Sequence, residues 1–587
     1  MKYLLTWIGL VIAALPITSA NASDYYVSAA NGNDQFDGRK ADPLGFSGPF
    51  ATLKPLQSLA LRHGDRILLK CGERFNGPLN ITVSATDSGE LLLANYGDCT
   101  SKPKPVIDGR IPFLAKASGQ LQQIRDTGPV EQLYADDVVL DRARFPANTY
   151  WVIPDGAQPS KTGLTVFGSQ IGKPLQGARI HARTEEWFIE ERNIKDPEGQ
   201  FDTPLQYPLR PKNGFYLSGK SWMVGDKFAW AYDNAERLLT VLAPANAVIS
   251  KVPAAHLVQA TGSGSLTISG IQLDAAGGDG INTRLDGIVT IKDVNIRRAT
   301  GNGIAIAGAK NAFIVNSTIT DVGLDGIFFA EVKRVFVRRN LVSNAGMFGT
   351  PRPSLAAINA HRTDSATIEE NFIENSAYIG IRFSGDARIR NNYVAQSCII
   401  LSDCAGIYTW RRNPQDKRPF SEISGNIVNG AKGDTSIKLG VNDYFTGIYL
   451  DEFSNDILVY NNIIVDVNQG IYLHNAYTNE VRNNVIRAKN TTILDAADKT
   501  KYPSLNSTSN ITRGNSERLG NFGLILTDTA GKKTNYSFDK AIKVELRPAS
   551  TKTPSQIGNS SCLRDAAYQQ QTADKNSVPV LAVFNCD

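Results

Sequence analysis

The sequence lacks the charge pattern of a nucleic-acid-binding protein. Its 62 Lys and Arg residues nearly balance 57 Asp and Glu residues, and the formal net charge is only +5. The two signs are interspersed, and basic runs are absent. We therefore expect no nucleic-acid partner, although a weakly basic surface is compatible with an anionic polysaccharide.

Cysteine is scarce, and its placement does not indicate a metal site. The chain has six cysteines, without a Cys-x-x-Cys motif or a histidine close by. No acidic cluster has the ligand spacing of a calcium site, so we predict no cofactor and leave calcium as the open alternative. The simplest of the possible connectivities pairs the cysteines in sequence order, as Cys71/Cys99, Cys398/Cys404 and Cys562/Cys586.

Long apolar runs are also missing after the first 22 residues, so we expect no membrane anchor. Those first residues have the pattern of a cleaved secretory signal peptide. Lys2 precedes an apolar stretch from Tyr3 to Leu15, and Ala20-Asn21-Ala22 fits an A-x-A cleavage site. Because disulfides persist in oxidising compartments, we expect a secreted or periplasmic protein.

What the sequence does contain is a repeated glycine-isoleucine step. Phrases such as NGIAIAG, DGIFFAE, AGIYTWRR, TGIYLDEF and QGIYLHNA share this step, and most intervals between the isoleucines are 23 to 26 residues. A period of this length is typical of solenoids. The isoleucines in this register are Ile281, Ile304, Ile327, Ile358, Ile381, Ile407, Ile448 and Ile471.

Short β segments accompany the repeats, and helical periodicity does not. Segments such as 312–315 and 457–460 are too short for amphipathic helices. The predicted fold is all-β, a single-stranded right-handed parallel β-helix with a β-rich insert near the N-terminus. Stacked coils would bury the last six isoleucines, from Ile327 onward, as one continuous column.

Asparagines recur after the repeat step and are often doubled. We expect Asn391, Asn461 and Asn483 to stack inside the turns and to hydrogen-bond to neighbouring coils. Asp279 and Asp325, which precede repeat glycines, are expected to form turns.

The period divides the chain into five segments. They are the signal peptide (1–22), an N-terminal cap with the first coils (23–110), a β-rich aromatic insert (111–253), the β-helix core with a cleft (254–487), and irregular C-terminal coils with a cap (488–587). Four of the five tryptophans that follow the signal peptide lie in the insert, where they either fill a β core or stack on sugar rings: Trp151, Trp187, Trp222 and Trp230.

The first mature segment resembles that of extracellular parallel β-helix proteins that act on polysaccharides. It contains YYVSAANGNDQFDG, GPFATL and GDRILLKCGERFNGPL, where this family commonly has YYVS…GND…DG and P(F)ATL…GD…LL. The insert phrases EEWFIEERNI and NGFYLSGKSWMVGDKF look like the β-rich insert of xylosidase-like and fucosidase-like glycoside hydrolases. This resemblance runs from Tyr25 to about Val485 and implies a polysaccharide or oligosaccharide partner. We expect the protein to be a monomer.

Alternation along the strands predicts where the substrate binds. If the repeat isoleucines point inward, the residues one and three positions later point outward. An exposed aromatic patch usually marks a binding surface, and the 41 residues from Gly406 to Gly447 predict a long loop beside it that contains Arg411, Arg412, Asp416, Lys438 and Asp443. The predicted substrate-binding residues are Arg382, Tyr408, Trp410, Tyr449, Tyr472, His361 and Arg411.

The catalytic candidates lie at the C-terminal end of this surface. The phrase GIYLDE resembles the GIYLDD or GIWLD step of xylosidase-like proteins, which implies that Asp451 is a catalytic aspartate. His474 has the same offset on the next repeat and is predicted to lie beside Asp451. Because a glycosidase needs two carboxyl groups, the second must be Asp403, Glu452 or Asp443. Asp403 belongs to DCAGIYTW, which is similar to a D-x-x-G-I-Y-T-W phrase of the β-helix family.

Three functions remain open at this point. We favour a glycoside hydrolase. The first alternative is a lyase or epimerase acting on a uronate polymer, with His474 or a tyrosine as the base and Arg382 as the cation that neutralises the uronate. The second is a noncatalytic β-helix that binds an exopolysaccharide.

Overall fold

The computed structural model describes residues 22–517, except 85–88, 115, 126, 165–170, 226, 349–353, 414–419, 432, 434–443, 499 and 503–508. Further along the chain it describes the backbone of β47 (Leu524–Thr527), β48 (Lys533–Tyr536), β49 (Lys543–Arg547) and β50 (Val580–Phe584). Residues 1–21 of the expected signal peptide, the loop residues Asp416, Lys438 and Asp443, and the expected Cys562/Cys586 pair lie outside the described residues.

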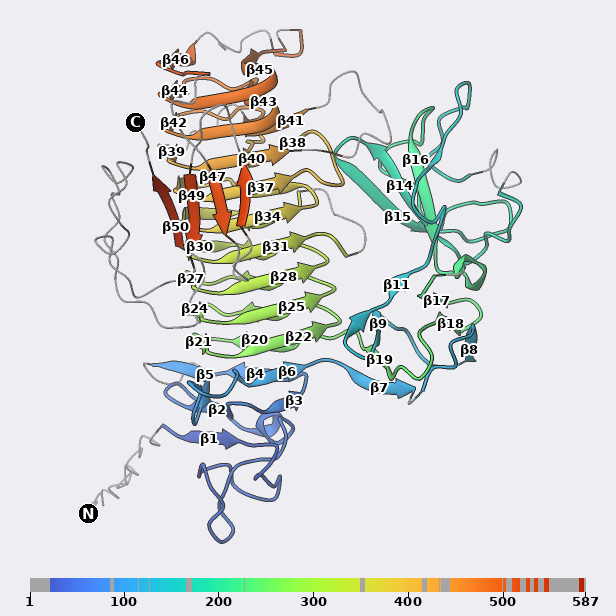
Figure 1. Ribbon diagram of the computed structural model, residues 1–587, viewed down its shortest axis with the longest axis vertical. Helices are drawn as coiled ribbons and strands as arrows, with labels where there is room; N and C mark the ends of the chain where they lie inside the picture. The colour runs from blue at the N-terminus through green and yellow to red at the C-terminus, as the bar shows by residue number, and fades with distance from the viewer. Residues whose placement is uncertain are drawn as a thin grey trace, which may run out of the picture.

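The chain folds as a right-handed parallel β-helix with a β-rich insert at its side (Figure 1). Most coils contribute a strand to each of three parallel sheets, so residues of equal register stack along the axis. The first sheet consists of β1 (Asp24–Val27), β2 (Arg66–Lys70), β5 (Glu90–Tyr96), β21 (Ser265–Ser269), β24 (Ile288–Lys292), β27 (Asn311–Val315), β30 (Val332–Arg338), β33 (Thr363–Glu369), β36 (Asp386–Arg390), β39 (Ser421–Ser424), β42 (Ile457–Tyr460), β44 (Glu480–Arg482) and β46 (Ile511–Arg513).

The other two sheets merge at the C-terminal end, where two long strands run through both. The second sheet consists of β3 (Arg74–Asn76), β6 (Val106–Asp108), β22 (Gln272–Ala276), β25 (Asn295–Ala299), β28 (Thr318–Val322), β31 (Leu341–Ala345), β34 (Phe372–Ser376), β37 (Tyr393–Ser397) and β40 (Ile427–Ala431). The third consists of β4 (Leu79–Val83), β20 (Val258–Gly262), β23 (Ile281–Arg284), β26 (Ile304–Ala307), β29 (Ile327–Ala330), β32 (Ala356–Ala360), β35 (Ile379–Phe383), β38 (Cys404–Thr409) and β41 (Phe445–Leu450). The two shared strands are β43 (Ile463–His474) and β45 (Val485–Ala496).

The predicted isoleucine column is confirmed. Each of the six isoleucines from Ile327 to Ile471 is the register partner of the next, and all six have an exposed fraction of 0%. Each contributes about 1.5–3 kcal/mol by burial. The glycine before the isoleucine has a steric reason, because a Cβ on Gly406 would lie 2.5 Å from Cγ1 of Val428 in the second sheet.

The predicted asparagine stack exists, but the prediction that Asn391, Asn461 and Asn483 form it is wrong. Asn391, Asn461 and Asn483 are exposed and have left-handed φ angles of 54°, 53° and 53°. The second asparagine of each doublet is buried instead and bonds to the next coil, because the first one makes the turn. The ladder consists of Asn340, Asn371, Asn392, Asn426, Asn462, Asn484 and Asn515.

Asp325 is buried and also links neighbouring coils. Its Oδ1 accepts hydrogen bonds from the backbone N–H of Ala356 (2.6 Å) and from Nδ2 of Asn359 (3.0 Å). Asp279 is buried as well, and its Oδ1 accepts from the N–H of Asn302 (2.7 Å).

Two of the predicted disulfides are present. Cys71 bonds Cys99 with a Cα–Cα distance of 5.3 Å, and Cys398 bonds Cys404 with a Cα–Cα distance of 5.9 Å. The second disulfide closes a short loop directly before β38.

The insert consists of small, mostly antiparallel sheets. They contain β7 (Ile111–Leu114), β8 (Gln122–Arg125), β9 (Gln132–Ala135), β10 (Val138–Val139), β11 (Asp141–Arg142), β12 (Arg144–Phe145), β13 (Trp151–Val152), β14 (Arg179–Glu185), β15 (Phe188–Asn193), β16 (Gly214–Ser218), β17 (Ala229–Asp233), β18 (Leu238–Leu242) and β19 (Ile249–Val252). A single-turn 3₁₀ helix, η2 (Ser221–Met223), follows β16 in the insert. Another, η1 (Pro55–Ser58), lies outside the insert, between β1 and β2.

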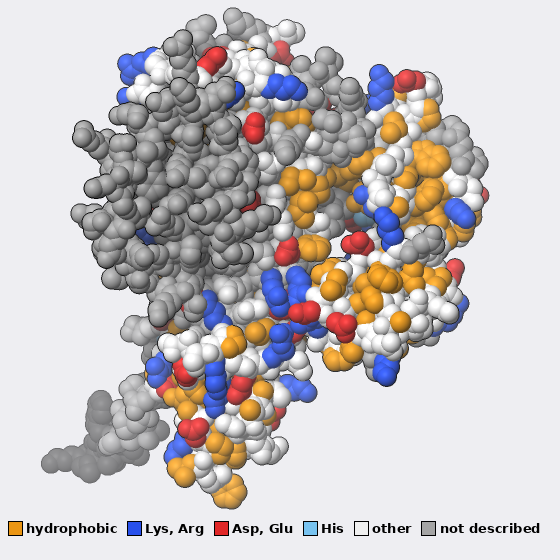
Figure 2. Space-filling model, viewed as in Figure 1, with side chains coloured by type: hydrophobic (Ala, Val, Ile, Leu, Met, Phe, Trp, Pro, Cys, Tyr) orange, Lys and Arg blue, Asp and Glu red, His pale blue; other side chains and the backbone are white. Residues whose placement is uncertain are grey.

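The four tryptophans of the insert pack against hydrophobic cores. The insert has two hydrophobic cores. Trp230 is buried in one of them, and Trp151 and Trp222 pack against the other. Trp187, at the end of the β14–β15 hairpin, packs against the core of the β-helix itself. The hairpin thus reaches the β-helix beside β38 (Figure 1), and the surface is hollowed between the insert and the β-helix (Figure 2).

Candidate active site

The candidate site lies on the outer side of the third sheet, at its C-terminal coils. Tyr408, Tyr449 and Tyr472 are register partners in β38, β41 and β43. Asp451 follows β41 directly, and His474 ends β43. The backbone N–H of Asp451 donates to the carbonyl of Thr409 (2.9 Å), which fixes the start of the turn that carries the carboxylate.

Asp451 is bound on both of its oxygens. Its Oδ1 lies 2.7 Å from Nδ1 of His474, and its Oδ2 accepts a hydrogen bond of 2.7 Å from the Tyr408 hydroxyl. The two side chains of the ion pair keep exposed fractions of 17% and 30%, so solvent and ligands can reach them. Burial lowers the pKa of His474, but the hydrogen bond and negative charge of Asp451 outweigh burial and raise that pKa above its ordinary value.

Asp403 is the candidate for the second carboxyl group. It has a left-handed φ of 53° within the Cys398–Cys404 loop, and its carbonyl accepts a hydrogen bond of 2.9 Å from the Tyr378 hydroxyl. Burial, followed by the negative charge of Asp451, raises the pKa of Asp403 to about 7. A hydrogen bond from Tyr449 opposes this shift. Asp403 can therefore carry a proton at neutral pH, while Asp451, whose negative charge acts on it, accepts two hydrogen bonds.

The predicted aromatic strip is present, but it is not the exposed platform that we expected. Tyr449 and Tyr472 have exposed fractions of 3% and 5%, because the rings stack on each other at 4.6 Å and Tyr444 covers Tyr472 at 5.4 Å. Tyr408 packs edge-on against Tyr449 at 5.3 Å and stays half-buried. The tyrosines therefore support the charged groups rather than offer a bare surface to a sugar.

The two predicted binding arginines are also buried. Arg382 has an exposed fraction of 4%, and its Nη1 donates to the carbonyl of Ser354 (3.2 Å). Arg411 has an exposed fraction of 5% and binds Asn455 through both of its terminal nitrogens. Both arginines hold neighbouring segments together, which corrects the expectation that they line an open cleft.

The remaining predicted residues, Trp410, His361 and Glu452, lie just after strands β38, β32 and β41 of the third sheet. Trp410 and His361 are partly exposed, and their rings are nearly parallel with centroids 6.4 Å apart. The Glu452 carboxylate lies 3.4 Å from the Lys501 ammonium, so it forms an ion pair with a residue other than Asp451 and His474.

Sequence reasoning missed one charged residue of this region. Glu186 lies between β14 and β15, and its backbone carbonyl accepts a hydrogen bond of 3.1 Å from the N–H of Ser402. Its negative charge contributes to the raised pKa of Asp403. The phrase EEWFIEERNI contained this residue, but no local pattern places the insert against β38.

A second cluster, inside the insert, has the connectivity of a catalytic triad. Oγ of Ser218 lies 2.7 Å from Nε2 of His181, and Nδ1 of His181 lies 3.2 Å from Oε1 of Glu191. Ser218 and His181 each have an exposed fraction of 5%, and Ser218 lies on β16 between β12 and β14. This cluster is a buried hydrogen-bond network of the sheet, because a substrate cannot reach its hydroxyl.

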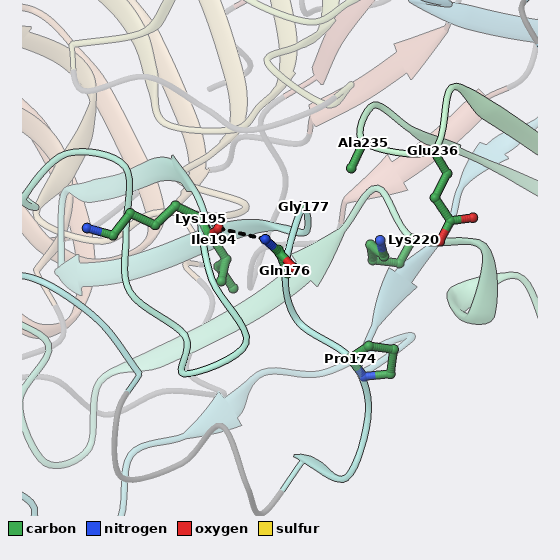
Figure 3. Close-up of a pocket in the computed structure, with 8 residues that line it drawn as sticks. All are labelled: Pro174, Gln176, Gly177, Ile194, Lys195, Lys220, Ala235 and Glu236. Atoms are coloured by element: carbon green, nitrogen blue, oxygen red, sulfur yellow. Dashed lines mark hydrogen bonds between the residues drawn. The ribbon is translucent and has the colours of Figure 1, made fainter.

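The insert also has a recess of about 420 Å³, away from these residues (Figure 3). The Lys220 ammonium that lines it pairs with Asp233 (2.5 Å), and Nε2 of Gln176 donates to the carbonyl of Lys195 (3.1 Å). Among its lining residues, Glu236 supplies the one carboxylate. The recess offers no pair of carboxyl groups comparable to Asp403 and Asp451.

The part of the chain that the structure describes has no group of three or more His, Cys, Asp or Glu side chains arranged to hold a metal ion. No helix among these same residues is both long and apolar enough to cross a membrane.

Comparison with known proteins agrees with the fold. Residues 256–415 match the family model described as the right handed beta helix region. No curated protein matched the chain. A solved structure described as a glycoside hydrolase is 16% identical, with a TM-score of 0.51 over 85% of this chain and 97% of its own.

Two other similar structures are more distant. The complex of XylC with xylose is 12% identical, with a TM-score of 0.38 over 84% of this chain and 69% of its own. The family 136 lacto-N-biosidase from Eubacterium ramulus is 11% identical, with a TM-score of 0.36 over 84% and 67%. Of these three likenesses, the one with a TM-score of 0.51 bears on the fold, and at 16% identity it shows the fold alone.

Proposed function

We propose that the chain is a polysaccharide-active glycoside hydrolase whose catalytic pair is Asp403 and Asp451. The observation that carries this proposal is the different environment of the two carboxyl groups. Burial and the charge of Asp451 raise the pKa of Asp403 to about 7, which suits a general acid. Asp451 accepts hydrogen bonds from Tyr408 and His474, which suits a carboxylate that acts in its ionised form.

In the proposed reaction, Asp403 donates its proton to the glycosidic oxygen as the bond to the anomeric carbon breaks. In one form of the reaction, Asp451 attacks the anomeric carbon as this bond breaks, and a water that gives its proton to the Asp403 carboxylate then hydrolyses the glycosyl-enzyme. In the other, Asp451 removes a proton from a water that attacks the anomeric carbon directly. Tyr408 and His474 hold the Asp451 carboxylate in one orientation. The partly exposed rings of Trp410 and His361 border the site and supply contacts for sugar rings.

The lyase and epimerase alternative receives less support. It needs a base near C5 and an accessible cation, but Arg382 is buried against Ser354. Burial and the charges of Asp451 and Asp403 raise the pKa values of Tyr408 and Tyr449, so these tyrosines are hydrogen-bond donors rather than bases. The noncatalytic alternative loses its aromatic platform, because Tyr449 and Tyr472 are buried.

Two further observations agree with the proposal. The disulfides Cys71–Cys99 and Cys398–Cys404 fit a secreted or periplasmic enzyme. The structure that shares the fold at a TM-score of 0.51 carries the description glycoside hydrolase.

Product analysis over a panel of neutral and acidic polysaccharides tests this proposal. We expect new reducing ends without ultraviolet absorbance, whereas an unsaturated uronate would indicate elimination. Replacing Asp451 by Asn should lower kcat by about 10²–10⁴-fold. Replacing Glu480 by Gln is the matched control, because this carboxylate lies on β44 of the first sheet and pairs with Arg513, and the change should leave turnover near normal. If no panel member is cleaved, or if Asp451→Asn retains full turnover, the proposal is wrong.

A further inference from the structure

The β14–β15 hairpin of the insert is built into the wall of the candidate site. Trp187 and Ile189 pack against the core of the β-helix. Arg183 has an exposed fraction of 0%, and its Nη2 donates to Oγ of Ser402 (3.1 Å). The N–H of Ser402 donates in turn to the carbonyl of Glu186 (3.1 Å). The hairpin is therefore fixed against the residue that precedes Asp403.

Asp403 is fixed from its other sides as well. The Cys398–Cys404 disulfide closes its loop, and the Tyr378 hydroxyl holds its carbonyl (2.9 Å). Neither Glu186 nor Asp403 can move away from the other without breaking these contacts. The docking of the insert thus holds the backbone of Glu186 beside that of Ser402, one residue before Asp403.

We propose that Glu186 is a positioning residue that acts through Asp403, so that the insert completes the acid half of the active site. This inference rests on the proposed function, because it takes Asp403 as the general acid. It assigns a role to the insert that the β-helix fold alone does not require.

The charges around Asp403 support this role. They come from Asp451 and His474 at the ends of strands of the third sheet and from Glu186 on the insert, while the neutral Tyr449 hydroxyl acts on Asp403 as a hydrogen-bond donor. The hairpin also carries three arginines: the Arg183 guanidinium bonds Ser402, while Arg179 and Arg192 pair with Glu191 and Glu190 of the hairpin itself. Burial opposes the ionisation of Asp403 most strongly, and the negative charges of Asp451 and Glu186 oppose it further. The Glu186 charge also contributes to the raised pKa of Tyr378.

The pH dependence of kcat/KM tests the proposal in the full-length protein. A general acid must be protonated, so activity falls as pH rises through the pKa of Asp403. Replacing Glu186 by Gln removes a negative charge and stabilises the ionised form of Asp403. The midpoint of the alkaline limb should therefore move to lower pH by about one unit. Glu186→Asp, which keeps the charge, should restore most of this shift.

Glu185→Gln is the matched control on the same hairpin. Glu185 pairs with Arg210 of the insert, so its replacement should leave the midpoint in place. An unchanged midpoint in Glu186→Gln overturns the proposal. So does a loss of cooperative thermal unfolding in that variant, because Glu186 would then be a structural residue.

A second readout does not depend on activity. The protonated Asp403 carboxyl gives a carbonyl band in pH-difference infrared spectra, which Asp403→Asn identifies by its absence. The titration midpoint of this band should lie near 7 and should fall in Glu186→Gln. If no polysaccharide is cleaved but the band shifts, the proposed function fails while the action of Glu186 on Asp403 stands. If the protein is active and the band does not shift, Glu186 has no such action.

Discussion

The chemistry proposed for this protein depends on a contact between two residues. Asp451 and His474 lie on successive coils and meet at 2.7 Å. The raised pKa of His474 means that the folded state binds the imidazole proton more tightly than the unfolded chain does. The stability that this pair contributes is fully present below the unfolded pKa of histidine. It is lost as pH rises through the folded pKa of His474.

Replacing Asp451 by Asn should lower the pKa of His474. The substitution removes the charge and the acceptor that hold the imidazolium, while burial, which lowers the pKa, remains. Histidine NMR can measure this directly, since the chain has only five histidines. His474→Gln identifies the signal of interest, and the other histidines are references. If the His474 midpoint is the same with and without Asp451, the two side chains do not pair in solution.

At the scale of the element, the structural role of a residue within its coil determines whether its position could be predicted from the sequence. The isoleucine column was predictable because burial requires the same side-chain type at the same register in every coil. The asparagine doublets were not resolved, because two identical residues gave no signal for which one makes the left-handed turn. In Asn391-Asn392 the first takes a φ of 54° and the second enters the ladder with an exposed fraction of 0%.

Because the first asparagine makes the turn and the second joins the ladder, replacing one or the other should change the free energy of unfolding by different amounts. Asn392→Ala should destabilise the protein by about 2–6 kcal/mol, because it leaves the buried N–H of Asn371 and the buried carbonyl of Ile368 unpaired, at about 1–3 kcal/mol each. Asn391→Gly should change stability by less than about 1 kcal/mol, because glycine accepts the left-handed conformation readily. Urea unfolding of both variants measures the difference. Equal losses would contradict the assignment of the ladder.

At the scale of the whole molecule, the candidate site combines parts that are far apart in the sequence. Asp403 and Asp451 were candidates from phrases within the repeats. The burial of Tyr449 and Tyr472 was not predictable, because it depends on Tyr444, which lies outside the repeat register. Glu186 was not predictable either, because its position depends on how the insert docks. Local patterns thus indicate the β-helix residues of the site but not what the rest of the chain adds to them.

The most direct test of the account compares kcat/KM of Asp403→Asn and Asp451→Asn on two substrates with the same sugar. One has the natural linkage, and the other has a dinitrophenyl leaving group that needs no proton. If Asp403 is the acid, Asp403→Asn should lose about 10²–10⁴-fold on the natural linkage and little on the activated glycoside, while Asp451→Asn should lose activity on both. Equal losses of Asp403→Asn on the two substrates, or an active Asp451→Asn, would contradict the assignment of this catalytic pair.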